Sequence, residues 1–223
     1  MPPRPSRNLD QSLLAAGRAL LPETGSAKLT IRQVCEAAGV NTGMFHYHFR
    51  TREAFLRSVM QSAYEEMFAR FTLEAAQGEG PVEQLRAALR LLGRFLRDNR
   101  AFMARVLAEA LSGEAVAREF LRDNVPRHAT VLFGLVARAQ REGRLRPMAP
   151  QQAVGVFAGA IAMPVFAAGA ILDFGAPPGS DGAALAQSLL GDRAIDERIE
   201  VALAGLVPSS SRPAPARKKK GRP

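Results

Sequence analysis

Apolar residues recur at steps of three and four along almost the whole chain, and no stretch shows the strict alternation of a half-buried strand. Such repeats cover residues 13–20, 55–71, 82–96, 102–111, 116–121, 131–139 and 195–206. Glycine and proline mark the boundaries, with Pro22 and Gly25 ending the first repeat and Pro126 separating two others. The pattern predicts an all-α protein.

Residues 30–52, TIRQVCEAAGVNTGMFHYHFRTR, predict two short helices joined by a tight turn. Thr30 and Gln33 have the spacing of a capping box, which starts a helix at Thr30. Gly39 can close that helix in the left-handed conformation, and Asn41 can cap the next one. This arrangement is typical of a helix-turn-helix, whose second helix enters the DNA major groove. By spacing alone, it also fits a helical hairpin in an ordinary bundle.

The second short helix has two distinct faces. Phe45 and Phe49 lie four residues apart and share a packing face, whereas Thr42, Gly43 and His46 share the other face. Thr42 offers a methyl and a hydroxyl, His46 offers ring nitrogens, and Gly43 allows close approach of the backbone. We therefore expect these three residues to read bases.

The string LTIRQVCEAAGVNTGMFHYHFRTREAFLRSV resembles the DNA-binding segment of the TetR family of transcriptional repressors, with a match from about Leu13 to Val59. The departures are Arg52 for the usual Lys, His46 for the usual Tyr and Cys35 for the usual Ala. The resemblance implies an N-terminal three-helix helix-turn-helix domain followed by a larger helical ligand-binding and dimerisation domain. It places Arg32 at a base and supports phosphate contacts by other residues, which gives this DNA-contacting set: Thr30, Arg32, Asn41, Thr42, Gly43, His46, Tyr47, His48, Thr51 and Arg52. For Tyr47 and His48, packing between helices is the alternative role.

The composition and the resemblance together predict four segments. These are a flexible basic arm at 1–8, the helix-turn-helix domain at 9–52, an effector-binding and dimerisation domain at 53–207, and a disordered basic tail at 208–223. The formal net charge is +9, of which +2 comes from Arg4 and Arg7 in the arm and +6 from the tail. The tail either solubilises the protein or attracts DNA without sequence preference.

Residues 153–172 carry no charge and are long enough to cross a bilayer. They are mostly Ala and Gly, with Pro164 inside, which gives a weak drive for membrane insertion. We therefore expect no membrane association. Instead, we expect a helix from about 150 to 172 that forms, together with a last helix at 192–207, the four-helix seam of a homodimer.

Phe and Met side chains cluster in the larger predicted domain with few polar residues between them. Any one of them can simply belong to the core, but flexible Met and flat Phe also suit a small hydrophobic or aromatic effector. The candidate ligand-binding residues are Met67, Phe68, Phe71, Phe102, Met103, Phe120, Phe133, Phe157, Met163 and Phe166.

Signals for enzymatic chemistry are poor. The chain has one cysteine, no Gly-rich phosphate loop and no His-Glu-x-x-His motif, so we expect no catalysis, no cofactor and no metal site. Cys35 is expected to be a small buried filler. The absence of a secretory signal and the single cysteine favour a cytoplasmic protein. The sequence thus favours a homodimeric, ligand-responsive repressor of double-stranded operator DNA. The alternative is a constitutive DNA-binding or nucleoid-associated protein without an effector.

Overall fold

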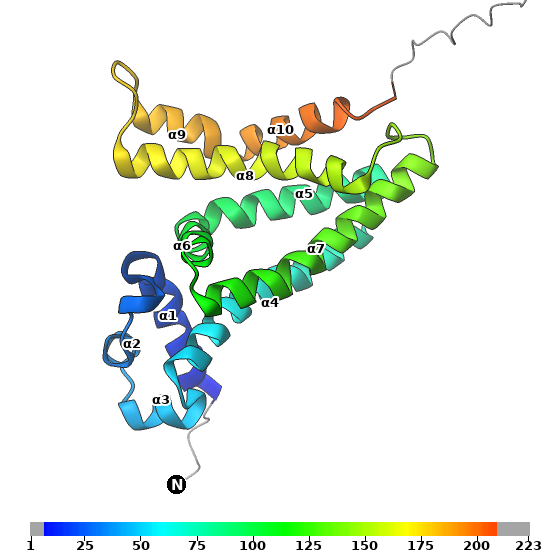
Figure 1. The fold of residues 1–223 in the computed structure, drawn as a ribbon. Helices are drawn as coiled ribbons and strands as arrows, with labels where there is room; N and C mark the ends of the chain where they lie inside the picture. Colours follow the sequence, from blue (N-terminus) through cyan, green and yellow to red (C-terminus); the bar gives the residue numbers. More distant parts are fainter. Residues whose placement is uncertain (1–6, 209–223) are drawn as a thin grey trace, which may run out of the picture.

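The computed structural model describes residues 7–208, and within them the chain forms ten helices and no strand. The predicted arm before Arg7 and the basic charges of the predicted tail lie outside the described residues. The helices are α1 (Arg7–Lys28), α2 (Ile31–Ala38), α3 (Thr42–Phe49), α4 (Arg52–Ala76), α5 (Pro81–Asp98), α6 (Arg100–Leu111), α7 (Ala115–Arg141), α8 (Pro150–Phe174), α9 (Gly182–Leu190) and α10 (Asp192–Ala204). Figure 1 shows α1–α3 at one end, α4 leading away from them, and α8–α10 as a layer at the other end. The fold is all-α, as predicted.

The predicted caps of the two short helices all form. Thr30 N donates to Gln33 Oε1 over 2.9 Å, and Gln33 N donates to Thr30 Oγ1 over 3.2 Å, which completes the capping box of α2. Gly39 closes α2 with φ 64°, where a glycine avoids a Cβ clash. Asn41 Oδ1 accepts from Met44 N over 2.9 Å and starts α3. The sequence therefore determined this turn through contacts within four residues.

The expected end of the first helical segment near Pro22 and Gly25 is confirmed at Gly25, where α1 loses helical geometry after continuing through Pro22. The expected break at Pro126 is wrong, because α7 runs unbroken through it. A proline inside a helix costs about 3 kcal/mol because it removes one hydrogen bond and crowds the preceding turn. In α7 that cost is offset by packing, because residues on both sides of Pro126, including Phe120 and Leu132, are buried against the other helices.

Helix α9 was not predicted from the sequence pattern. Residues 182–190 form a helix whose N-terminus is capped by Asp181, with Oδ1 accepting from Ala183 N over 2.9 Å and Ala184 N over 3.1 Å. The segment is short and consists largely of Gly, Ala, Ser and Leu, so its periodicity is weak. Packing against α8 decides its structure.

A continuous core joins the N-terminal helices to the rest of the chain, and α4 is the shared element. Near its start, Phe55 and Val59 pack so closely on α1 that a Cβ added at Gly17 would lie 2.5 Å from the Phe55 ring and 2.8 Å from a Val59 methyl. About two turns later, Tyr64 and Met67 of the same helix are buried among the helices of the larger part. A shift of α4 therefore reaches both ends of the molecule.

The apolar helix α8 has one buried and one open stripe. By length and composition, Pro150–Leu172 is the one helix in the described part that could cross a membrane, and 22% of its apolar window is buried. Within the fold, the buried stripe is Ala153, Phe157, Ile161, Val165 and Ala168, against α5, α7, α9 and α10. The other side exposes Gly155, Gly159 and Met163, and added Cβ atoms at both glycines would meet nothing within 4 Å.

The apolar side of the last helix faces the core of its own chain. Ile195, Ile199 and Leu203 of α10 are fully or almost fully buried within the single chain, so they are not free to form the expected dimer seam. They pack on α5 and α8, and Arg–carboxylate pairs such as Arg90–Asp196, with Nε to Oδ1 at 3.0 Å, fasten α10 to α5. Only its outer side, including the 73% exposed Val201, stays open.

Candidate nucleic-acid interface and apolar cavity

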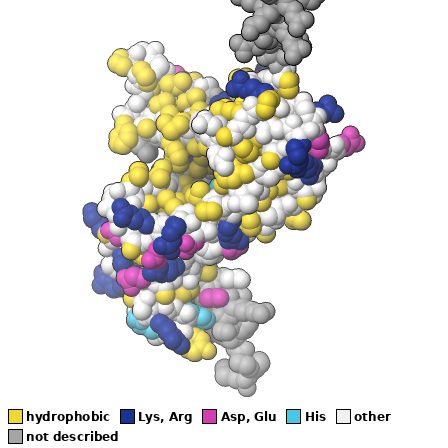
Figure 2. Space-filling model, turned by 45° about the vertical axis from the view of Figure 1, so that its right-hand side comes forward, with side chains coloured by type: hydrophobic (Ala, Val, Ile, Leu, Met, Phe, Trp, Pro, Cys, Tyr) yellow, Lys and Arg dark blue, Asp and Glu magenta, His cyan; other side chains and the backbone are white. Residues whose placement is uncertain are grey.

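The face of α3 opposite the core is open. Phe45 is fully buried, with ring centroids 5.0 Å from Phe55 and 5.6 Å from the half-buried Phe49, so the predicted packing face is correct. Thr42, Gly43 and His46 are all exposed, as a reading face requires. Histidine and arginine side chains gather at this end of the molecule in Figure 2. DNA contact by these residues stays a prediction.

The tautomer of His46 follows from its hydrogen bond. Nδ1 lies 3.2 Å from the Arg50 carbonyl oxygen, which can only accept, so Nδ1 carries the proton. In the neutral ring, Nε2 is then an acceptor. It therefore suits the amino group of adenine or cytosine, and it can donate to guanine only when the ring is protonated.

Three of the four predicted threonine and asparagine contacts are caps at helix N-termini. Thr30, Asn41 and Thr51 begin α2, α3 and α4, and Thr51 Oγ1 accepts from Ala54 N over 3.1 Å. All three are exposed. Free amides at a helix N-terminus attract phosphate, so this placement is compatible with backbone contacts.

The predicted arginines differ in their freedom. Arg32 has an 85% exposed side chain held loosely by Glu36 across the helix surface, Nε to Oε1 at 3.5 Å. Arg52 is only 29% exposed, its Nε donates to the Leu29 carbonyl over 2.7 Å, and its Nη2 is buried without a partner among the described residues. Arg52 thus ties the start of α4 to the end of α1, a structural role that the sequence analysis did not foresee.

Tyr47 and His48 are also separated by the fold. Tyr47 is 74% exposed beside the reading face, whereas His48 is half-buried and its Nε2 is sealed from solvent without a partner in the described part of the chain. The two rings meet edge to face with centroids 5.2 Å apart. Tyr47 is therefore free to reach phosphate, and His48 lies mainly in the packing.

Arg50 is an exposed cation that the sequence analysis overlooked. Its φ of 61° makes it the one non-glycine residue with positive φ among those described, a conformation that costs roughly 1 kcal/mol. This residue turns the chain from α3 into α4, and its side chain points into solvent next to the reading helix. A lone arginine at a helix end gives no sequence signal for this role.

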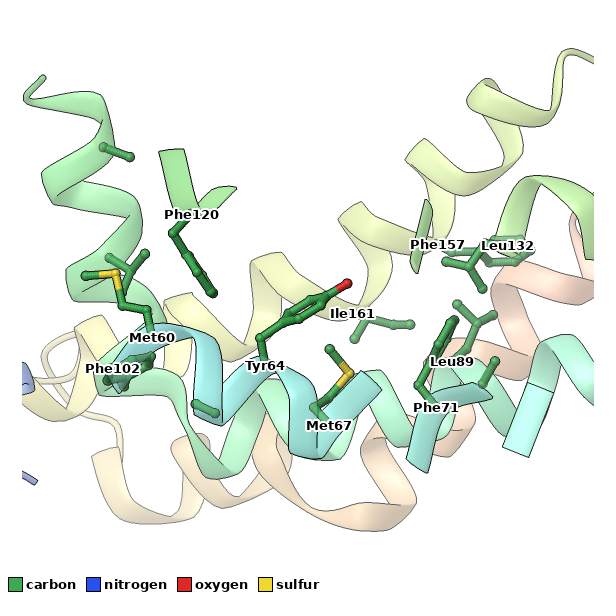
Figure 3. Close-up of a cluster of buried hydrophobic side chains, with 14 of the residues drawn as sticks. Met60, Tyr64, Met67, Phe71, Leu89, Phe102, Phe120, Leu132, Phe157 and Ile161 are labelled. Atoms are coloured by element: carbon green, nitrogen blue, oxygen red, sulfur yellow. The ribbon is translucent and has the colours of Figure 1, made fainter. Parts of the chain in front are cut away.

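A partly enclosed apolar cavity of about 280 Å³ lies in the larger part of the chain. Figure 2 shows hydrophobic side chains gathered around a hollow, and Figure 3 shows Tyr64, Met67, Phe102, Phe120, Phe157 and Ile161 around the same interior. The lining comes from five helices: Ala63, Tyr64 and Met67 of α4; Leu89, Leu92, Phe95 and Leu96 of α5; Phe102 and Met103 of α6; Phe120, Leu121, Asn124, Val125, His128, Ala129 and Leu132 of α7; Val154, Phe157, Ala158, Ile161 and Ala162 of α8.

Half of the predicted effector residues line this cavity, namely Met67, Phe102, Met103, Phe120 and Phe157. The other five do not. Phe71 is core, Met163 is 65% exposed on the open stripe of α8, and Phe68, Phe133 and Phe166 are half-buried elsewhere. Composition could not separate the two groups, because both contain Phe and Met on helices.

Three polar residues in the cavity wall were missed. Tyr64 Oη donates to the Asn124 carbonyl over 2.7 Å and lies 3.3 Å from His128 Nδ1. Burial raises the pKa of Tyr64 to about 12, and burial lowers the pKa of His128 below its usual value. Both side chains are therefore neutral near pH 7. The spacing of four between Asn124 and His128 on one helix face was the only local signal.

Two helices connect this cavity to the N-terminal domain. Besides α4, α6 carries Phe102 and Met103 in the cavity wall and, one to two turns later, Arg105 and Glu109 against the end of α1. Glu109 Oε1 accepts from Ser26 N over 2.6 Å, and Arg105 donates to the Pro22 carbonyl over 3.2 Å. A change in the cavity can thus reach α1 through either helix.

Potential metal ligands and the single cysteine are placed as follows by the fold. The described residues contain no group of three His, Cys, Asp or Glu side chains that could hold a metal ion. Cys35 is buried as expected of a core filler, and burial raises the pKa of its thiol, which disfavours a reactive thiolate.

Comparison with known proteins gives consistent results. Residues 13–59 match the family model described as bacterial regulatory proteins, tetR family. Among curated relatives, the HTH-type transcriptional regulator UidR of Escherichia coli (strain K12) is 24% identical over 138 residues, which cover 60% of this chain and 68% of UidR.

Two solved structures show the same fold. The transcriptional regulator FadR from Bacillus subtilis, in complex with stearoyl-CoA, superposes with a TM-score of 0.66 at 15% identity and covers 88% of this chain and 98% of its own. The ketosteroid transcriptional regulator KstR2 of Mycobacterium tuberculosis superposes with a TM-score of 0.65 at 17% identity. The superposition covers 89% of this chain and 95% of KstR2. At these identities the likeness concerns the fold alone.

Proposed function

Because this chain belongs to the TetR family of transcriptional regulators, we propose that it is a homodimeric repressor released from its operator by a small, largely apolar molecule. Two copies of α3 read successive major grooves about 34 Å apart. The effector occupies the apolar cavity and changes the spacing of the two reading helices.

The observation that carries this proposal is the continuity of α4. Near the start of this helix, Phe55 and Val59 pack closely against α1 at Gly17. Further along the same helix, Tyr64 and Met67 line the cavity. A helix transmits a displacement along its axis as a nearly rigid rod. Ligand binding and DNA binding therefore share one mechanical element.

Dimerisation rests on the open stripe of α8. Gly155, Gly159 and Met163 leave an apolar stripe of α8 exposed in a single chain, and Val201 of α10 is exposed as well. Soluble monomers rarely expose large contiguous apolar patches, and small residues let two helices approach closely. The proposed partner for this face is a second copy of the same chain.

The test begins with DNA retardation using the region upstream of the chain's own gene, followed by addition of small apolar compounds. We expect specific retardation and release by at least one compound. A matched variant tests the coupling: Glu109→Ala removes the acceptor for Ser26 N outside the cavity and away from α3. It should keep DNA and compound binding but weaken the release.

If the DNA is bound specifically and no apolar compound binds or releases the protein, the effector-free DNA-binding alternative replaces this proposal. If Glu109→Ala responds like the unchanged chain, α6 is not part of the coupling.

A further inference from the structure

Among the described residues that line the apolar cavity, His128 is the one whose side chain keeps a nitrogen or oxygen atom without a hydrogen-bond partner. Building on the effector site proposed above, we propose that the cavity takes an uncharged, largely apolar molecule with one hydrogen-bond donor, such as a hydroxyl group, and that His128 Nε2 accepts this hydrogen bond. The volume of about 280 Å³ is at the small end for ligand pockets, so the ligand is compact.

The wall of the cavity disfavours a charged ligand. No Lys, Arg, Asp or Glu is among the described residues that line it. Moving an ionised group from water into apolar surroundings is costly unless an opposite charge or several hydrogen bonds compensate it. Arg127 lies nearby, but it pairs with Glu65, with Nη1 to Oε1 at 2.6 Å, and its guanidinium covers the Tyr64 and Phe68 rings at 5.0 and 4.2 Å.

Asn124 has no hydrogen-bonding capacity left for a ligand. Its Nδ2 donates to Gln61 Oε1 and to the Phe120 carbonyl, both over 2.9 Å. Its Oδ1 accepts from Gln61 Nε2 and from Arg127 Nη1, both over 3.1 Å. An amide has two donor protons and two acceptor positions, so this buried side chain is saturated.

Tyr64 is also occupied, and its hydrogen bond fixes the tautomer of His128. A phenol has one proton, and the 2.7 Å contact with the Asn124 carbonyl requires it, because a carbonyl oxygen only accepts. Tyr64 Oη can then only accept from His128 Nδ1, 3.3 Å away, so Nδ1 carries the ring proton. In a neutral imidazole, the remaining nitrogen Nε2 is an acceptor only.

His128 Nε2 is available to a molecule in the cavity. The His128 side chain belongs to the lining, its Nδ1 side is turned to Tyr64, and Nε2 has no hydrogen-bond partner in the described chain. It is not among the sealed unpartnered atoms. Because burial lowers the pKa of His128, the ring enters the complex neutral.

The cavity wall therefore favours ligands that carry a hydrogen-bond donor over ligands that carry only an acceptor or no polar group. A hydroxyl satisfies Nε2, whereas a fully apolar molecule leaves it without a partner, and a ketone places acceptor against acceptor. One neutral hydrogen bond contributes about 0.5–1.5 kcal/mol net, which corresponds to an affinity ratio of roughly 2- to 12-fold.

Three probes of nearly equal shape test this in the full-length protein by isothermal titration calorimetry: para-propylphenol, para-fluoropropylbenzene and para-propylbenzoate. Only the first carries a donor at neutral pH, and the third is charged. We expect the phenol to bind roughly 2- to 12-fold more tightly than the fluoro compound, and the benzoate to bind most weakly. In His128→Phe the phenol should lose this advantage while the fluoro compound keeps its affinity.

His128→Gln is a second variant that keeps the test valid if His128→Phe does not fold. Its amide oxygen can accept the same hydrogen bond, so this variant should retain part of the preference for the phenol over the fluoro compound. Equal affinities of phenol and fluoro compound in the unchanged protein overturn the role of His128 and leave the apolar effector site standing. A tighter-binding benzoate overturns the uncharged ligand class. Failure of all three to bind counts against both this inference and the effector site on which it rests.

Discussion

Replacing Gly159 by leucine should separate the dimer without harming the single chain. A Cβ at this position meets nothing within 4 Å, and leucine is the better helix former by roughly 0.8 kcal/mol, so folding of one chain should not suffer. In a two-fold symmetric interface the new side chain enters twice. Overpacking of about 1–3 kcal/mol at each site amounts to about 2–6 kcal/mol, or a dimer dissociation constant raised by roughly 30-fold to more than 10,000-fold.

Gly134→Leu is the matched control, because Gly134 is an exposed helical glycine of α7 whose added Cβ also meets nothing within 4 Å. Sedimentation equilibrium over a nanomolar to micromolar range, with thermal melts alongside, measures both variants. The expected result is a dimeric Gly134→Leu and a largely monomeric Gly159→Leu. If both dimerise like the unchanged chain, the open stripe of α8 is not the dimer contact, and a single-chain mass for the unchanged protein at micromolar concentration removes the dimer altogether.

Four further changes give distinct outcomes. Gly43→Ala should change the free energy of unfolding by less than about 1 kcal/mol but weaken operator binding at least tenfold, because the backbone no longer approaches the groove; equal affinity in a retardation titration would refute close approach. Arg52→Ala should lower the free energy of unfolding in urea by about 1.5–3 kcal/mol through loss of the Leu29 carbonyl contact, and an unchanged midpoint would favour the phosphate role. The pKa of His128 is lowered in the folded state, so the unfolded chain takes up the proton first and stability should fall as pH drops below about 6.5. His128→Phe should flatten that fall, and an unflattened curve would assign it to other groups. Deleting residues 208–223 should flatten the slope of log affinity against log salt by up to about 0.9 per lost phosphate contact, equally for all DNA sequences, whereas an unchanged slope leaves the tail a solubilising segment.

The cavity shows where sequence reasoning stops. Met67 and Phe71 lie four residues apart on α4 and are both buried, yet only Met67 faces the cavity. The polar contacts that define its chemistry join Tyr64 to Asn124 and His128, sixty or more residues away. Periodicity reports which side of a helix is apolar, but it does not report which neighbouring helix that side meets or where packing leaves a gap.

The sequence by itself determined the helix-turn-helix, because its capping box at Thr30 and its caps at Gly39 and Asn41 are contacts between residues at most four apart, and residue types fix such contacts. It also determined the all-α class through the helical period of its apolar residues. Only the tertiary structure decided that α7 continues through Pro126 and that the stripe of α10 is buried within its own chain. Both outcomes depend on burial against helices distant in sequence, and the free energy of that packing exceeds the local preferences on which sequence patterns report.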